Sequence, residues 1–375
     1  MSFRKRNTPI LSTRTPPTSS RSPSTQSKPA GRSQFVRPST LLPSYLTHST
    51  GTASLDKLML HGGQPLGTSL LVLEDGATDF ASVIARCYAS QGVANSDVVV
   101  AVGTHPRWGV ELPAPAAAAA AVVEHGKIDK KSPPLMSSSD PHANKDLKIA
   151  WRYKNSVSSS TLPQDDELYC RTWNITARLL PPPTLQYVEP ASYSSIISHL
   201  NTIVTSNADK IIWVVLPNFL SPTLYNPATS FMPDELLKFL ISLRALLRTY
   251  HSRLSVLITM STGLFDQAGT GNSVLLPWIE TIIDGMIKII PTPPPDTTAG
   301  AGAAVAGRGG DNANKYQGFI DVLKVPIVSE RGGMVVRTMD YVFKVTKSGL
   351  KIEKWGIPVM IDEKGDDKKQ GELEF

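Results

Sequence analysis

The sequence contains few cysteines and no long uninterrupted apolar run. Only two of its 375 residues are cysteine, Cys87 and Cys170, and each stands beside apolar residues that are typical of a core. So few cysteines exclude a disulfide scaffold and favour two buried thiols in a reducing compartment, the cytoplasm or the nucleus. The longest apolar runs fall short of the roughly 20 residues that a membrane-spanning helix needs. We therefore expect no membrane association, and the polar start of the chain does not resemble a secretory signal.

The signatures of common catalytic sites are also missing from the sequence. The seven histidines are scattered, with no H-E-x-x-H motif and no Cys/His cluster at metal-ligand spacing. No G-x-S-x-G turn is present. Cys87 lies in a predicted helix beside Ile84 and Tyr88, which favours a structural thiol over a nucleophile. The sequence therefore predicts no catalytic residue, no metal and no cofactor.

Positive charge is concentrated at the N-terminus. The formal net charge is +6, and removing the eight basic side chains of residues 1–40, which include no acid, leaves −2 for the rest of the chain. These side chains are Arg4, Lys5, Arg6, Arg14, Arg21, Lys28, Arg32 and Arg37. Because the segment is rich in Ser, Thr and Pro, we expect a disordered basic arm. The arm fits a nucleic-acid contact or a nuclear-import signal, and equally a solvated tail with no specific role.

The remaining chain alternates strand and helix patterns. Apolar strands are predicted at 70–73, 98–102, 211–216 and 254–260, and helices at 79–91, 193–204 and 233–250. Three further strands at the C-terminal end predict an antiparallel meander. We expect one α/β domain over 41–360, with low-complexity inserts at about 112–146 and 291–315 and a charged tail at 361–375. This pattern predicts a RecA-like core with a central, mostly parallel sheet and C-terminal antiparallel strands.

The segment 49–88 has the layout that opens a RecA-type ATPase core, but the chemistry of its phosphate-binding loop is absent. An active loop reads G-x-x-x-x-G-K-[ST], in which glycine amides and the lysine hold phosphates and the hydroxyl holds magnesium. In the register set by Gly67, these four positions are occupied by Glu74, Asp79, Phe80 and Ala81. Two glycines have become acids, the lysine a phenylalanine and the hydroxyl a methyl group. We therefore predict a retained fold with a degenerate phosphate-binding loop.

A second part of an ATPase site is missing as well. The strand that should end in a magnesium-positioning carboxylate ends instead at Leu216, Pro217 and Asn218. If the first strand is read in another register, Glu74 or Asp75 would supply a carboxylate, but no lysine follows within the loop. The turn containing Gly269 and Gly271 lacks a lysine, and we interpret it as a flexible loop that a RecA-type ring would project into its channel.

Several stretches resemble the subunit 4 family of the Elongator complex. They include LKIAWRYKN at 147–155, YCRTWNITARLLPP at 169–182 and YVFKVTKSGLKIEKWGIP at 341–358, and order and spacing agree from about 40 to 358. The resemblance implies a RecA-like subunit without working phosphate motifs that forms a heterohexameric ring with subunits 5 and 6. It implies attachment to the catalytic subunits 1, 2 and 3, tRNA binding, and support of carbon-5 modification of the wobble uridine (U34). Cofactors of that reaction belong to the catalytic subunit, so none is expected here.

Candidate contact residues follow from local chemistry. Trp151, Arg152 and Tyr153 form an aromatic–cation cluster, and such residues are favoured interface anchors. The tRNA candidates are basic residues of the arm and of two short patches: Arg4, Lys5, Arg6, Arg152, Lys154, Lys344, Lys347 and Lys351. The alternatives are a divergent recombinase-like ATPase that acts on single-stranded DNA, and a scaffold ring that carries no nucleic acid. We expect residence in the cytoplasm and the nucleus.

Overall fold

A computed structural model describes residues 35–116, 168–226, 232–264, 275–292, 316–327 and 338–355. The chain divides into two units, Met1–Arg32 and Ser33–Phe375, and all described residues belong to the second. Several predicted features lie outside the described residues. They are Arg4, Lys5 and Arg6 of the arm, the cluster Trp151, Arg152 and Tyr153 with Lys154, and the turn with Gly269 and Gly271.

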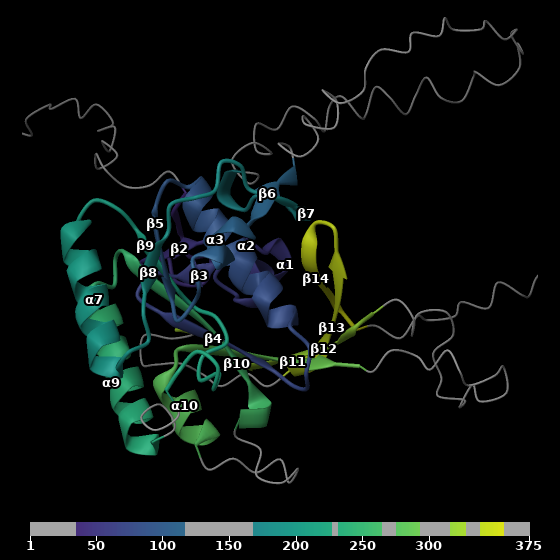
Figure 1. Cartoon of the computed structure of the whole chain (residues 1–375). Helices are drawn as coiled ribbons and strands as arrows, with labels where there is room; N and C mark the ends of the chain where they lie inside the picture. The colour runs from purple at the N-terminus through teal and green to yellow at the C-terminus, as the bar shows by residue number, and fades with distance from the viewer. Residues whose placement is uncertain are drawn as a thin grey trace, which may run out of the picture. The chain divides into compact units, whose positions relative to one another are not determined.

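Six helices and one short 3₁₀ turn occur in the described chain (Figure 1). They are α1 (Ala53–Leu58), α2 (Phe80–Ala94), α3 (Arg107–Val110), α7 (Tyr193–Ser206), α9 (Pro233–Thr249), η1 (Thr262–Leu264) and α10 (Leu276–Ile282). The longest, α9, begins with a proline at its first position and carries Asp234 and Glu235 in its first turn, two features that favour a helix start. Among these residues, no helix combines the length and apolar character that crossing a bilayer requires.

The strands form one large sheet and two small ones. The large sheet contains β4 (Ser69–Glu74), β5 (Val98–Val102), β8 (Gln186–Val188), β9 (Ile212–Leu216), β10 (Leu254–Ser261), β11 (Gly285–Pro291), β12 (Gly318–Lys324), β13 (Thr338–Thr346) and β14 (Gly349–Lys354). The small sheets contain β1 (Arg37–Pro38), β2 (Leu46–His48) and β3 (Gln64–Pro65), and β6 (Pro113–Pro115) with β7 (Trp173–Arg178).

The order of strands in the large sheet identifies the architecture. In space the strands run β14-β13-β12-β11-β4-β10-β9-β5-β8. Neighbours from β11 to β8 pair in parallel, whereas β12, β13 and β14 pair antiparallel. If the core strands β4, β5, β9, β10 and β11 are numbered 1 to 5 along the chain, their order in space is 5-1-4-3-2, as in a RecA-type core. The prediction of an α/β fold with a mostly parallel sheet and C-terminal antiparallel strands is confirmed.

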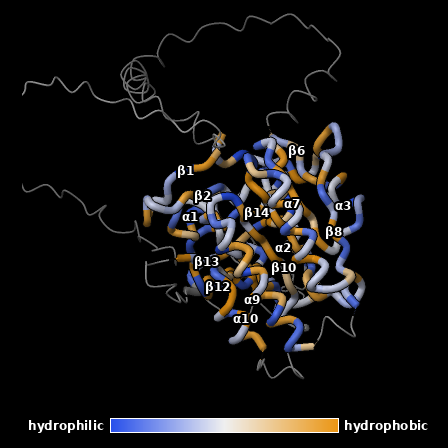
Figure 2. The backbone as a smooth tube through the Cα atoms, turned by 90° about the vertical axis from the view of Figure 1, so that its left-hand side faces the viewer, coloured by the Kyte–Doolittle hydropathy of each residue, from blue (hydrophilic) through white to orange (hydrophobic). Residues whose placement is uncertain are grey.

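Two apolar layers hold helices against the two faces of this sheet. Successive side chains of a strand point to opposite faces, so Val214 and Leu216 pack on one side and Trp213 and Val215 on the other. Helices α7, α9 and α10 cover the first face, and α1 and α2 cover the second. In Figure 2, orange apolar stretches gather where α2 and β10 meet. Such double coverage explains why the core strands read as continuous apolar runs.

The boundaries of several elements differ from the prediction by a few residues. Strand β5 and the starts of α7 and α9 match the prediction, and α2 runs three residues further than 79–91. The folded part begins before residue 40, because β1, which lies inside the segment predicted as an arm, pairs with β2. Likewise, β6 lies in the segment predicted as the insert 112–146, where it pairs with β7. Proline-rich composition concealed both of these short strands.

Candidate functional site: a phosphate loop filled by its own glutamate

The four degenerate loop positions lie at the turn between β4 and α2. Glu74 is the last residue of β4, Asp79 precedes α2, and Phe80 and Ala81 are the first two residues of that helix. Strand β4 lies between β10 and β11 and runs parallel to both. Because the turn follows the end of β4, it stands at the carboxyl edge of the parallel strands. Ligands of open α/β sheets bind at that edge. The location is therefore that of a phosphate site, and its chemistry decides whether phosphate can bind.

The carboxylate of Glu74 occupies the N-terminus of α2. Its Oε1 accepts hydrogen bonds from the Phe80 N–H at 2.8 Å and the Thr78 hydroxyl at 2.6 Å, and its Oε2 accepts one from the Ala81 N–H at 2.7 Å. Glu74 is buried, and the side chain of Asp79, at the N-cap position, makes no capping hydrogen bond. Free N–H groups at such a terminus are the donors that hold a phosphate. Here a carboxylate of the same chain takes those donors.

Asp75, the neighbouring acid, is fixed by contacts on the other side of the loop. Its Oδ2 lies 2.8 Å from Nζ of Lys288 on β11, and its Oδ1 accepts a hydrogen bond from the Thr262 hydroxyl. Its N–H donates to the carbonyl of Ile289 at 3.0 Å. The carboxylates of Glu74, at the end of β4, and of Asp75, just after it, are therefore both engaged by protein donors. Neither is presented as a ligand for magnesium.

The position of the phosphate-binding lysine carries an aromatic ring that packs inward. Phe80 and Phe343 of β13 meet edge to face, with ring centroids 5.0 Å apart. This pair ties the start of α2 to the antiparallel strands, a contact that an aromatic pair favours beyond simple burial. Phe80 thus serves the packing of the fold, and it brings no cation to the loop.

The opposite part of an ATPase site also lacks its carboxylate in the described chain. Strand β9 ends at the buried Leu216, and Asn218 follows with a φ of +47°. The N–H of Asn218 donates to the Thr259 hydroxyl at 2.9 Å. The strands on either side of β4 end at Ser261 and Pro291, so neither carries an acid at its last position. Two separate components of nucleotide hydrolysis are thereby absent from these residues.

Sequence reasoning did not foresee a buried polar layer under α2. His48 Nε2 lies 2.7 Å from the Ser255 hydroxyl, which also accepts a hydrogen bond from the Tyr88 hydroxyl at 2.9 Å. The His48 ring meets Trp213 edge to face at 4.1 Å. Burial lowers the pKa of His48 to about 4, so the ring is neutral at neutral pH. The contacts are those of a packed core histidine, and the helical or strand period of the sequence gives no signal for them.

Asp56, noted in the sequence only as part of a Leu-Asp pair, organises the turn before α1. Its carboxylate accepts hydrogen bonds from the Ser49 hydroxyl at 2.5 Å and from the hydroxyl and N–H of Thr50 at 2.6 and 2.8 Å. Burial raises its pKa to about 6. Burial likewise raises the pKa of Cys87 and of Cys170 to about 12, so both thiols stay protonated at neutral pH. Cys87 is fully buried as predicted, whereas Cys170 is only partly so.

Comparison with known proteins places the chain in a family. The family described as PAXNEB protein matches residues 31–374. The chain belongs to the PAXNEB family. Two relatives of this PAXNEB chain are named "Elongator complex protein 4": one from Saccharomyces cerevisiae, 28% identical over 86% of this chain and 76% of the relative, and one from Schizosaccharomyces pombe, 25% identical over 92% and 93%. The resemblance to the Elongator subunit 4 family is confirmed.

A solved structure also shares similarity with the PAXNEB chain. A KaiC-like protein from Pyrococcus horikoshii OT3 is 12% identical and covers 82% of this chain and 98% of its own, with a TM-score of 0.40. The RecA-type assignment rests on the strand order given above. Among the described residues, no group of three or more His, Cys, Asp or Glu side chains is arranged to hold a metal ion.

The structure places one of the two predicted basic patches. Lys344 and Lys351, on β13 and β14, both lie near the Glu353 carboxylate, at 3.1 and 2.9 Å. Lys347 is exposed at the turn between these strands, and its carbonyl accepts a hydrogen bond from the Ile175 N–H at 2.9 Å. The other tRNA and interface candidates lie outside the described residues, so they stay predictions.

Proposed function

We propose that this chain is a non-catalytic subunit of an Elongator complex. It joins two sister RecA-like subunits, numbers 5 and 6, in a heterohexameric ring that attaches to the catalytic subunits 1, 2 and 3. The ring binds tRNA and supports carbon-5 modification of the wobble uridine (U34). Residence in the cytoplasm and the nucleus accompanies this role. Family membership supports the assembly, because the relatives are named as proteins of that complex.

The observation that carries the non-catalytic part is the Glu74 carboxylate at the N-terminus of α2. A triphosphate would have to displace this buried acid. Phe80 stands at the position of the phosphate-binding lysine, so that position supplies no cation to stabilise the bound triphosphate. A RecA core in this state still presents the faces through which such cores assemble. Assembly is therefore the role that the retained fold supports best.

Nucleotide binding by the full-length chain tests the non-catalytic part. A fluorescent ATP analogue with magnesium should show no saturable signal with the isolated chain. A divergent recombinase-like ATPase would instead bind the analogue and would be stimulated by single-stranded DNA. Saturable binding of the analogue at micromolar concentration would refute the claim that Glu74 blocks the phosphate-binding position at the N-terminus of α2.

Affinity purification of the tagged chain from its native cells tests the assembly. We expect two further RecA-like subunits in a six-membered particle, with larger catalytic subunits retained at low salt. The matched variant is Trp151→Ala, which should reduce recovery of the sister subunits if the predicted cluster is an interface anchor. Recovery of a lone monomer or a homo-oligomer would contradict the ring.

A further inference from the structure

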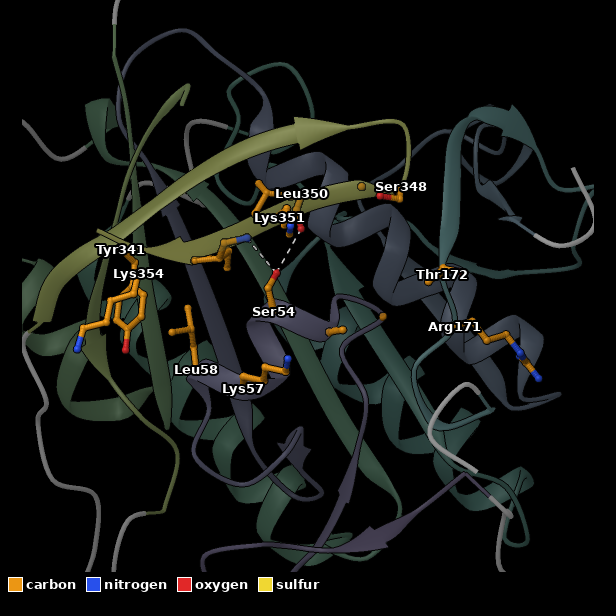
Figure 3. Close-up of a pocket in the computed structure, with 14 residues that line it drawn as sticks. Ser54, Lys57, Leu58, Arg171, Thr172, Tyr341, Ser348, Leu350, Lys351 and Lys354 are labelled. Carbon is orange, nitrogen blue, oxygen red and sulfur yellow. Dashed lines mark hydrogen bonds between the residues drawn. The ribbon is translucent and has the colours of Figure 1, made fainter. Parts of the chain in front are cut away.

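A cleft of about 420 Å³ lies between α1, the β13–β14 hairpin and the residues just before β7 (Figure 3). Four basic side chains line it, Lys57, Arg171, Lys351 and Lys354, and no Asp or Glu does so. The folded part of the chain has almost no excess charge, because most basic residues in it are balanced by acids. Four cations around one cleft are therefore a local concentration of positive charge.

The cations are held in different ways, and two of them are free of ion pairs. Lys57 and Lys354 are exposed, and neither makes an ion pair with any described residue. Lys351 pairs with Glu353 at 2.9 Å. The Arg171 guanidinium extends away from Ser54 and Lys351 (Figure 3), donates a hydrogen bond to Asn95 Oδ1 at 3.4 Å and lies 5.3 Å from the ring of Phe35. The unpaired ammonium groups of Lys57 and Lys354 are therefore the charges that the cleft offers to an anion.

Hydrogen bonds between α1 and β14 preorganise the cleft. The Ser54 hydroxyl of α1 accepts a hydrogen bond from the Ile352 N–H at 3.1 Å and donates to the Leu350 carbonyl at 3.4 Å. These bonds, drawn in Figure 3, fasten α1 to the outer edge of strand β14. Leu58 and the half-buried Tyr341 add apolar surface and an aromatic ring to the lining. A groove that combines cations with an aromatic ring is typical of nucleic-acid binding.

A second cleft extends the basic surface past α1. It has a volume of about 400 Å³, shares Ala53 and Lys57 with the first, and adds Arg37, whose guanidinium lies 4.3 Å from the Tyr169 ring. Asp56 also lines this second cleft, but it is 5% exposed and its carboxylate accepts the hydrogen bonds described above. Basic side chains thus occur in two adjoining clefts. This spacing suits a chain of phosphates better than a single one.

We infer that these adjoining clefts bind the phosphodiester backbone of RNA. The inference rests on the proposed function, in which the RNA is tRNA, and it names the surface of this subunit that makes the contact. Lysine and arginine contacts to phosphates act through release of counterions and give affinity without sequence preference.

The test measures binding of a fluorescently labelled tRNA transcript to the full-length chain by anisotropy, at salt concentrations from 50 to 200 mM. The cleft variant is Lys57→Gln/Lys354→Gln, and the control is Lys210→Gln/Lys238→Gln, which removes the same charge from exposed lysines elsewhere. Each lost phosphate contact should flatten the plot of log affinity against log salt by about 0.7–0.9. Two lost contacts should flatten it by about 1.4–1.8 and weaken binding about 20-fold at 0.15 M salt.

Each result separates the cleft from the wider proposal. A flatter slope for the cleft variant, with the control unchanged, supports the inference. If the wild-type chain binds tRNA and both double variants bind it equally well, the cleft assignment alone is wrong. If the wild-type chain binds no tRNA, the cleft assignment fails, and the proposed function fails as well only if the ring recovered by affinity purification also binds no tRNA. Displacement of tRNA by millimolar inorganic phosphate at matched ionic strength would assign a small-anion site and overturn the inference. Equal free energies of unfolding for all three proteins exclude loss of fold as a cause.

Discussion

Replacing Glu74 by alanine should destabilise the protein and open an anion site at the same time. The substitution removes the acceptor for the Phe80 and Ala81 N–H groups, and Ala81 is 3% exposed, so water reaches its N–H poorly. A stranded buried donor costs about 1–3 kcal/mol, and loss of a helix N-terminal acceptor costs about 0.5–2 kcal/mol. We expect the free energy of unfolding to fall by about 2–4 kcal/mol.

A glutamine at the same position separates charge from shape. Glu74→Gln keeps one acceptor oxygen but removes the negative charge, and hydrogen bonds with an ionised partner are about twice as strong as neutral ones. The loss should therefore be about half that of the alanine variant, about 1–2 kcal/mol. Urea unfolding at neutral pH measures both losses. An alanine variant within about 0.5 kcal/mol of the wild type would refute the role assigned to the carboxylate.

Added phosphate gives the second readout for this variant. In Glu74→Ala the vacated N–H groups can hold an anion, and phosphate at about ten times its dissociation constant restores about 1.4 kcal/mol. The control is Glu111→Ala, which removes an ion pair with Arg86 at 3.2 Å but vacates no helix terminus. Phosphate also stabilises proteins in general, so the wild type and the control fix that background. Equal stabilisation of all three proteins would show that no anion site had opened.

Two further predictions concern the core. Because burial raises the pKa of Asp56 from 3.8 to about 6, its contribution to stability is complete below about pH 4 and is lost as pH rises from about 4 to 6; relative to Asp56→Asn, the wild type should lose about 3 kcal/mol over that range in pH-dependent urea titrations. His48 contributes with the opposite sign, since its pKa is lowered, but it is present in both proteins and cancels. A difference that stays flat with pH would contradict the assignment. Gly92→Ala should destabilise by about 1–3 kcal/mol, although alanine usually favours a helix, because the added Cβ would meet Trp213 at 2.9 Å. Gly263→Ala, whose added Cβ would come no closer than 3.6 Å to the Ser261 hydroxyl, is the control, and an equal effect at both sites would show that crowding is not the cause.

The fold followed from the sequence where periodicity is strong. The apolar strands and the amphipathic helix that starts at Tyr193 carry period and composition together, so their type and place were predictable. Short strands such as β1 and β3 were not, because each has two residues and includes a proline, and they pair through a neighbour that only the fold supplies.

The loss of the phosphate-binding residues was predictable from the sequence, but the contact of the Glu74 carboxylate that takes the place of a phosphate was not. The residue types at Glu74 and Phe80 reveal that phosphate chemistry is missing. They do not reveal that the Glu74 carboxylate accepts hydrogen bonds from the N–H groups of Phe80 and Ala81, six and seven residues later in the chain, since no sequence pattern encodes that contact. The basic clefts were less visible still. Lys57 and Lys354 line one cleft because α1 packs against β14, and only Lys351 stood out in the sequence as part of a local cluster of charge.

The bond between Ser54 and β14 has a consequence for how the protein is made. It joins residues that are 298 positions apart, so the edge of the sheet that α1 covers is completed only when the end of the chain is available. During synthesis, α1 and α2 emerge long before the strand against which they pack. Until then β14 does not cover the apolar faces of α1 and α2. A truncated polypeptide that ends before residue 349 would lack β14 and would leave these faces uncovered permanently. Such truncated chains are natural substrates for chaperones and proteases, because exposed apolar surface is what both recognise.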